Sequence, residues 1–273
     1  MNVLLVSNSQ ICFLDNYVSN VNVLESFPVI VSIAADPGAH VACQNLAKSK
    51  AATRAVLLCA KSPTMAKSDI VIGAKDYGTS KFGRVAWQKV PTILTVIGMD
   101  MGIMLTDIDM VWFANPAPYL LYSSSIVETQ CHQCMPADNL GIIVAFPGTE
   151  DIIKEWRTMG QTQSNDNDAF RQAMTEAQKR DSKAYMHCMP RYSFGFAIGL
   201  GDDKMAPDGQ LATDYWPYSK AAFEGSAKKQ LTKHFVATDD KVRDMQRMKV
   251  WKHALYGPDK CTLKSGLFSC DKC

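Results

Sequence analysis

The chain has 273 residues, of which 47% are hydrophobic and 21% are charged, and 29 basic against 27 acidic side chains give a net charge of +2. This composition is typical of a globular protein and excludes the collagen, coiled-coil and disordered classes. A protein that binds nucleic acid normally carries a clustered basic excess, so we expect no nucleic-acid partner.

The first part of the chain alternates short apolar runs with helical stretches. The runs that we expect to form strands cover residues 3–6, 29–34, 55–58 and 70–72. After the second run, Asp36-Pro37 indicates the start of a helix, because proline is favoured in the first turn. Strands that alternate with helices predict a mostly parallel sheet that is covered on both faces.

The clearest predicted helix covers residues 82–97. Apolar residues recur in it at intervals of three and four, which is the spacing of one helix face. Lys89 falls on that apolar face. Either its ammonium group reaches the edge of the helix along an apolar stem, or it points at an anion near the edge of the sheet.

The later elements continue the α/β pattern. We expect strands at residues 103–106, 125–129 and 141–146, and a weaker strand-like segment at 192–200. Thr149 opens a predicted helix that extends to Met159, and Asp166 opens another over residues 167–179. The chain shows neither an internal repeat nor a linker. We therefore expect a single α/β domain with a mixed, mostly parallel sheet flanked by helices.

The most informative motif is Asp107-Ile108-Asp109, which directly follows the apolar run 103–106. Residues two apart on an extended segment point the same way, and open α/β sheets bind ligands at the carboxyl ends of their strands. Two carboxylates this close repel each other, and a cation such as Mg²⁺ or Mn²⁺ removes the repulsion. Two kinds of chemistry fit the motif. In one, the cation stabilises a diphosphate leaving group; in the other, the first aspartate attacks a phosphate.

The stretch from Leu105 to Pro116 resembles a segment of the nucleotide-diphospho-sugar transferases, which are GT-A-fold glycosyltransferases related to plant xylosyl-, arabinosyl- and galactosyltransferases. Three further segments are similar to motifs of that family and occur in the same order. They are Lys89-Val90-Pro91, Asn139-Leu140-Gly141 with Leu140 in place of threonine, and Asp166-Asn167-Asp168-Ala169-Phe170 with Asn167 in place of glutamine. The resemblance covers roughly residues 1–174 well and the rest only loosely.

The resemblance implies one GT-A-like domain over residues 1–273, with a nucleotide-binding half at 1–110 and an acceptor-side half at 111–273. It implies the transfer of a sugar, either a pentose such as xylose or galactose, from a UDP-sugar to a glycan acceptor. The implied cofactor is Mn²⁺ or Mg²⁺. The sequence gives no indication of the oligomeric state.

The resemblance also implies a role for individual residues. Asp107 and Asp109 would hold the metal with His234, which lies in a C-terminal segment whose spacing is shortened. Lys89 would add positive charge, and Asp166 and Asp168 would bind sugar hydroxyls or act as a base toward the acceptor. The expected contacts to the nucleotide sugar are Ser7, Asn8, Lys89, Asp107, Ile108, Asp109 and Asn139. The structural alternative for Asp166 and Asp168 is stabilisation of a helix N-terminus.

Two other functions remain open from the sequence. Asp107-Ile108-Asp109-Met110-Val111 also fits the nucleophile motif of haloacid-dehalogenase-like phosphatases, with Asp107 as the nucleophile. That family would normally place this strand near the start of the chain. The third possibility is a non-catalytic protein that keeps the fold and binds a glycan or a nucleotide.

The sequence shows neither a membrane span nor a secretory signal, because its most apolar stretch is too short and its N-terminus lacks a basic region. With nine cysteines and no signal peptide, we expect reduced thiols and a cytoplasmic location. A Golgi location is expected only if the chain is truncated. Two C-x-x-C pairs, Cys131–Cys134 and Cys270–Cys273, have a spacing that suits zinc, although free thiols are the simpler interpretation.

Overall fold

The structure is a computed structural model that describes a defined part of the chain. The described residues are 1–7, 10–24, 27, 29–49, 54–62, 85–124, 126–130, 139–160, 166–181, 184–189, 194–196, 231–234 and 245.

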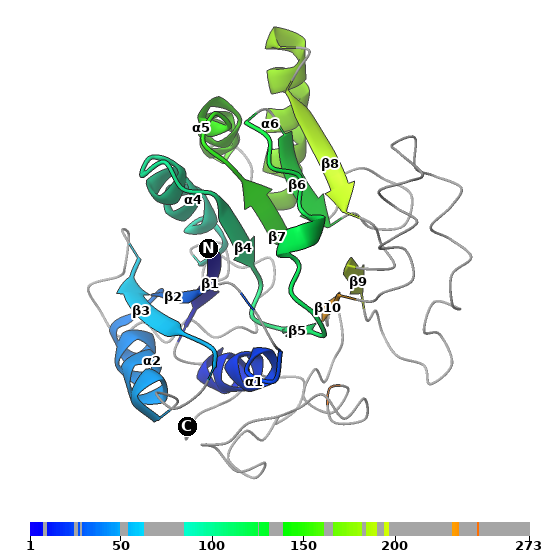
Figure 1. Cartoon of the computed structure of the whole chain (residues 1–273). Coiled ribbons are helices and arrows are strands. Elements are labelled where there is room, and N and C mark those ends of the chain that lie inside the picture. Colours follow the sequence, from blue (N-terminus) through cyan, green and yellow to red (C-terminus); the bar gives the residue numbers. More distant parts are fainter. Residues whose placement is uncertain are drawn as a thin grey trace.

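A seven-stranded sheet forms the centre of the molecule (Figure 1), in the order β3-β2-β1-β4-β7-β6-β8. All of its strands run in one direction except β7, which is antiparallel to both of its neighbours. The strands are β1 (Asn2–Val6), β2 (Ile30–Ala34), β3 (Leu57–Lys61), β4 (Ile103–Thr106), β6 (Ile126–Gln130), β7 (Asn139–Ala145) and β8 (Tyr185–Met189). The predicted mixed, mostly parallel α/β sheet is confirmed.

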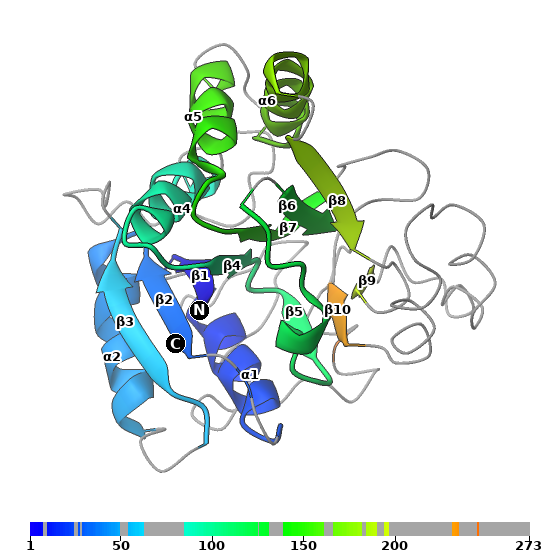
Figure 2. The ribbon, with the colours of Figure 1, turned by 45° about the horizontal axis from the view of Figure 1, so that its top comes forward.

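Helices cover both faces of this sheet, as Figures 1 and 2 show. Each face has its own hydrophobic core, because alternate residues of a strand point to opposite sides. One core packs the sheet against α1 and α2, and the other packs it against α4, α5 and α6. The helices are α1 (Ile11–Val21), α2 (Pro37–Ser49), α4 (Lys89–Ile97), α5 (Glu150–Met159) and α6 (Asp166–Arg180), with the short 3-10 helix η2 (Ala117–Tyr119) after β5.

A smaller sheet of three strands lies beside the large one (Figure 2), in the order β5-β10-β9. Its strands are β5 (Met110–Trp112), β9 (Phe194–Phe196) and β10 (Thr232–His234). β10 is antiparallel to β5, and this pairing sets His234 opposite Met110. The small sheet therefore brings a residue from late in the chain next to the segment that follows β4.

The predicted helix 82–97 is not continuous, because α4 begins only at Lys89. The expected start at residues 82–84 lies outside the described residues. Residues 85–86 form a helical turn, and residues 87–88 form a turn between it and α4. Pro91 explains the break. It has no N–H to donate to the carbonyl of Trp87, and its ring would clash with that carbonyl in a continuous helix. Within the first turn of α4, by contrast, the missing N–H costs nothing.

The other predicted elements appear close to their expected positions. β3 begins two residues later than the apolar run 55–58, and β9 lies inside the strand-like segment 192–200. Asp36 precedes α2, and its carboxylate accepts a hydrogen bond from the N–H of Ala39 at 2.8 Å. The expected strand 70–72 and both C-x-x-C pairs lie outside the described residues.

The expectation of reduced thiols is wrong at three cysteines. Cys43 of α2 and Cys59 of β3 form a disulfide with a Cα–Cα distance of 5.9 Å, and Cys12 is also disulfide-bonded. Sequence spacing alone does not determine which cysteines meet. The Cys43–Cys59 bond closes a loop across a sequence separation of 16 residues and ties α2 to the edge strand of the sheet.

Replacing both Cys43 and Cys59 with alanine is expected to lower the free energy of unfolding by about 3 kcal/mol. This is the usual effect of opening a loop of this length, because the unfolded chain regains conformational freedom. Urea unfolding measures the change. Wild-type protein in a reducing agent should be no more stable than the variant, because the reducing agent also opens the disulfide of Cys12. A variant within about 0.5 kcal/mol of the oxidised wild type would contradict the prediction.

None of the helices in the described part of the chain combines the length and the apolar character that crossing a membrane requires.

Candidate active site

The candidate site lies at the edge of the large sheet where the parallel strands end. Asp107 directly follows β4 and Ser7 directly follows β1, while the antiparallel β7 begins at this edge with Asn139. The N–H of Asp107 donates a hydrogen bond to the carbonyl of Gly141 at 2.7 Å, which joins the end of β4 to the start of β7. Open α/β sheets bind ligands at this edge.

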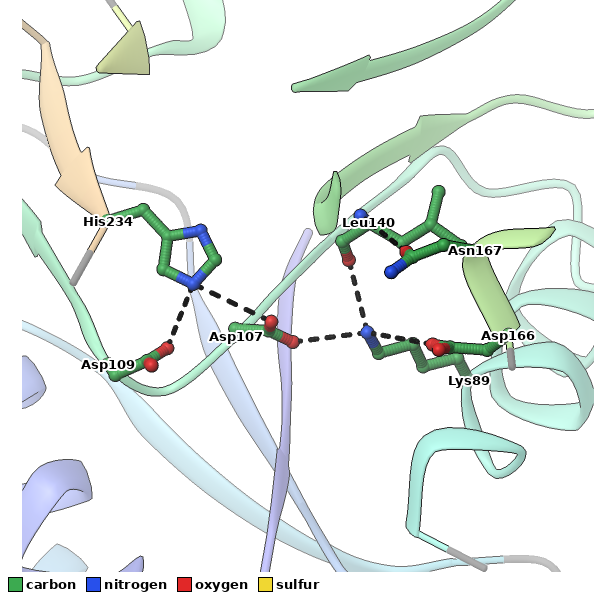
Figure 3. A network of polar contacts seen from close by, with 7 residues as sticks. All are labelled: Lys89, Asp107, Asp109, Leu140, Asp166, Asn167 and His234. Carbon is green, nitrogen blue, oxygen red and sulfur yellow. Dashed lines mark hydrogen bonds and ion pairs between the residues drawn. The ribbon is translucent and has the colours of Figure 1, made fainter. Parts of the chain in front are cut away.

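Lys89 is the centre of a buried ionic group at this edge (Figure 3). Its Nζ lies 3.3 Å from Oδ1 of Asp107 and 3.4 Å from Oδ2 of Asp166, and it donates a hydrogen bond to the carbonyl of Leu140 at 3.2 Å. The side chains of Lys89 and Asp166 are only 11% and 9% exposed. The structure thus favours the interpretation in which the lysine points at anions rather than at solvent.

The position of Lys89 is costly in two ways. It is the first residue of α4, where the helix dipole disfavours a cation, and it is largely removed from water. Burial alone would lower the pKa of Lys89, but the charges of Asp107 and Asp166 and their hydrogen bonds outweigh it and leave the pKa raised. Two carboxylates from separate parts of the chain therefore keep the buried ammonium group positively charged. A buried cation at a helix N-terminus goes against local structural preferences, and such exceptions are common at functional sites.

Asp166 is held in place by the packing of α5 against α6. It is the first residue of α6, a position where the helix dipole favours a carboxylate. The indole N–H of Trp156 in α5 donates to the carbonyl oxygen of Asp166 at 2.9 Å. The ring of Trp156 also packs edge-to-face on Phe170, with centroids 5.1 Å apart. These contacts fix the start of α6 relative to the sheet edge.

A second group forms on the other side of Asp107, where the small sheet delivers His234. Nε2 of His234 lies 3.1 Å from Oδ1 of Asp109 and 3.7 Å from Oδ2 of Asp107. The imidazole is 1% exposed, and the carboxylates of Asp107 and Asp109 are 34% and 13% exposed. Asp107 consequently belongs to both groups, with one oxygen toward Lys89 and the other toward His234 (Figure 3).

The residues Asp107, Asp109 and His234 suit a divalent cation. Each offers one ligand atom, and these atoms lie within 4.8 Å of one another. Ligands that share one Mg²⁺ at about 2.1 Å are at most about 4.2 Å apart, so the observed spacing is close to what an ion requires. The two carboxylate oxygens are ligands that Mn²⁺ and Mg²⁺ prefer, whereas the imidazole nitrogen is a more usual ligand of transition-metal ions.

The sequence of residues 27–219 matches the family described as nucleotide-diphospho-sugar transferase. The chain belongs to this family.

Solved structures with the same fold include glycosyltransferases of the GT-A type. An active-site mutant of LgtC has a TM-score of 0.53 at 8% identity, covering 87% of this chain and 88% of LgtC. The apo form of the glycosyltransferase GlyE from Streptococcus pneumoniae TIGR4 has a TM-score of 0.53 at 12% identity, covering 88% of this chain and 55% of GlyE. The bifunctional glycosyltransferase WbbM has a TM-score of 0.51 at 13% identity, covering 93% of this chain and 51% of WbbM.

These similarities establish the GT-A fold. The chain spans about half the length of WbbM and GlyE. No curated protein matches the sequence. Membership in the nucleotide-diphospho-sugar transferases does not favour the phosphatase alternative.

Other residues that the sequence singled out lie in different settings. Ser7 is buried at the end of β1, and its N–H and hydroxyl both donate to Oε1 of Gln10, at 3.1 and 3.0 Å. The side chain of Ile108 is buried in the core shared with α1. Asn8 lies outside the described residues, and Asn139 is described only by its backbone at the start of β7. Their contacts with a nucleotide sugar stay predictions.

Asp168 lies on the exposed side of α6 and pairs with Arg171 at 3.2 Å. The structure therefore brings Asp166, but not Asp168, into the ionic group around Lys89. A role for Asp168 toward the acceptor stays a prediction.

The sequence did not identify Asn167 and the peptide of Leu140 as parts of the site. Oδ1 of Asn167 accepts a hydrogen bond from the N–H of Leu140 at 3.1 Å, and the carbonyl of Leu140 accepts the bond from Lys89 (Figure 3). The available signal was that both residues depart from the family motifs. The two residues contact each other in the structure, and their positions in the sequence do not reveal this contact.

Proposed function

We propose that this nucleotide-diphospho-sugar transferase moves a sugar from a UDP-linked donor to a glycan acceptor, and that Mn²⁺ or Mg²⁺ is held by Asp107, Asp109 and His234. Xylose, as an example of a pentose, and galactose are the proposed sugars. The observation that carries the proposal is the convergence of two carboxylates and one imidazole, from segments 125 residues apart, at the ligand-binding edge of the sheet.

The proposed chemistry follows from the charge of the donor. Breaking the bond between the sugar and the diphosphate leaves negative charge on the diphosphate, and preorganised positive groups at that point lower the barrier. When bound, a divalent cation supplies this by neutralising the departing diphosphate. Asp107 and Asp109 cannot contact the diphosphate favourably by themselves, because carboxylates repel it. Their proposed part is to hold the cation, with His234 as the third ligand.

The remaining residues also have proposed parts. Lys89 places a positive charge beside Asp107, where it attracts the diphosphate or the sugar hydroxyls. Asp166 accepts hydrogen bonds from those hydroxyls, and Asp168 acts on the acceptor side. Ser7, Asn8, Ile108 and Asn139 line the nucleotide side. We propose residues 1–110 as the nucleotide-binding half and residues 111–273 as the acceptor-side half.

Release of free nucleotide from a panel of sugar nucleotides tests the proposal. The protein is incubated with Mn²⁺ and each UDP-sugar, first alone and then with glycan acceptors, and the same reactions are repeated with a chelator. We expect slow hydrolysis of one UDP-sugar that depends on the metal, with acceleration by the correct acceptor. Donors linked to other nucleotides and simple phosphomonoesters serve as controls.

Each outcome distinguishes among the functions that the sequence left open. Cleavage of phosphomonoesters without nucleotide release would indicate a phosphatase. Binding of UDP with no turnover of any donor would indicate a non-catalytic protein. Turnover that persists after the chelator would remove the cation from the proposal.

A further inference from the structure

The hydroxyl group of Tyr17 is a fully buried hydrogen-bonding centre beneath the candidate site. Tyr17 lies in α1, and its side chain is 0% exposed. Its oxygen is 2.5 Å from Nδ2 of Asn2, 2.5 Å from Nε1 of Trp112 and 3.3 Å from Oγ1 of Thr106. Oγ1 of Thr106 is in turn 3.2 Å from Oδ1 of Asn2. Four residues from four different elements therefore meet at one point.

The directions of these hydrogen bonds follow from the chemistry of the groups. The amide of Asn2 and the indole of Trp112 can only donate through these nitrogens, so the Tyr17 oxygen accepts both bonds. Its own proton then goes to Oγ1 of Thr106, whose proton goes to Oδ1 of Asn2. Every group in the network has a partner. Burial raises the pKa of Tyr17 to about 12 even though its hydrogen bonds oppose the shift, so its hydroxyl keeps the donated proton.

The network holds both ends of the segment that carries the candidate metal ligands. Thr106 is the last residue of β4 and directly precedes Asp107, while Trp112 is the last residue of β5, three positions after Asp109. The other two members lie in β1 and α1, which pack against β4 and β5 respectively. The turn between β4 and β5 is thereby fixed to the core at its entry and at its exit.

We propose that Tyr17 is a positioning residue that sets the spacing of Asp107 and Asp109 through Thr106 and Trp112. The proposal rests on the proposed function, because it requires these carboxylates to bind a cation. Tyr17 itself does not reach the site. It acts by excluding other conformations of the turn, and groups that orient metal ligands in this way typically contribute 10-fold to 100-fold in metal affinity.

Binding of Mn²⁺ to the full chain, measured from the electron paramagnetic resonance signal of the free ion, tests the proposal. Replacing Tyr17 with phenylalanine removes only the hydroxyl, and we expect the Kd for Mn²⁺ to rise about 10-fold. Thr149→Val is the matched control. Thr149 is also fully buried, and its hydroxyl donates to the carbonyl of Phe146 at 2.8 Å at the start of α5. This variant should lose comparable stability and keep the wild-type Kd.

A second pair of variants keeps the test decisive if Tyr17→Phe does not fold. Thr106→Val removes the hydroxyl that links Tyr17 to Asn2, and Thr106→Ser keeps it. We expect Thr106→Val to weaken Mn²⁺ binding about as much as Tyr17→Phe does, and Thr106→Ser to remain within about twofold of the wild type.

The outcomes separate this proposal from the proposed function. If the wild type does not bind Mn²⁺, the proposed function fails. If the wild type binds Mn²⁺ and folded Tyr17→Phe binds it equally well, or if Thr106→Val equals Thr106→Ser, the positioning role of Tyr17 is wrong while the metal site stands. An equal loss of affinity in Thr149→Val would also overturn it, because the effect would then reflect stability alone.

Discussion

Replacing Asp109 with asparagine is expected to reduce nucleotide release from the sugar donor about 1,000-fold while the protein stays folded. Removing a single preorganised charge-stabilising group from an active site typically costs 100-fold to 1,000-fold, and here the change also removes a proposed ligand of the cation. The amide has the size of the carboxylate, so packing around His234 is retained. Turnover of the UDP-sugar in saturating Mn²⁺ measures the effect, and circular dichroism checks the fold.

Asp151→Asn is the matched control for this variant. Asp151 lies in the first turn of α5, and its side chain is 92% exposed. It forms an ion pair with Lys154 at the surface. Its replacement should leave turnover within about twofold of the wild type, as expected for an exposed residue away from the site. Folded Asp109→Asn protein that keeps more than about a tenth of wild-type turnover would contradict the metal-binding role.

Replacing Lys89 with methionine is expected to lower the free energy of unfolding by about 3 kcal/mol and to weaken donor binding or turnover. Removing one partner from a buried ion pair leaves uncompensated charge in a poorly solvated place, which typically costs 3–5 kcal/mol. We expect the lower end of that range because the carboxylate of Asp107 is 34% exposed. Urea unfolding and steady-state kinetics with the UDP-sugar measure the two effects.

Lys154→Met and a double variant complete this experiment. Lys154 pairs with Asp151 at 3.0 Å on the surface, and its replacement should change the stability by no more than about 1 kcal/mol. Lys89→Met leaves two carboxylates without the lysine, and adding Asp166→Asn removes the charge of the more buried one. The double variant should therefore regain more than about 1 kcal/mol over Lys89→Met. Equal losses in Lys89→Met and Lys154→Met, with unchanged kinetics, would contradict both expectations.

Sequence patterns predict the local part of this fold well. Continuous apolar runs identify β1, β2 and β4 almost to the residue, because strands buried on both faces leave little polar signal between their ends. The Asp107-Ile108-Asp109 motif is also visible in the sequence, because both carboxylates belong to one short segment. The break at residues 87–88 does not appear in the apolar periodicity, and only Pro91 indicates it, because proline constrains the preceding turn of a helix.

The long-range part of the site could not be derived from patterns. His234 reaches Asp109 only because β10 pairs with β5, and periodicity carries no information about such a pairing. The sequence identified it through family resemblance alone. Lys89 had two interpretations until the structure placed Asp107 and Asp166 beside it. The disulfide between Cys43 and Cys59 and the hydroxyl network of Tyr17 likewise depend on which elements pack together.

The insertion of β10 between β5 and β9 has a consequence for biosynthesis. The strands of the large sheet are complete once residue 189 has been made, whereas the imidazole beside Asp109 arrives with residue 234. A nascent chain can thus assemble its main scaffold while β5 still lacks the neighbour that delivers His234. A product ending before β10 would keep Asp107 and Asp109 but lack His234, the proposed third ligand of the cation.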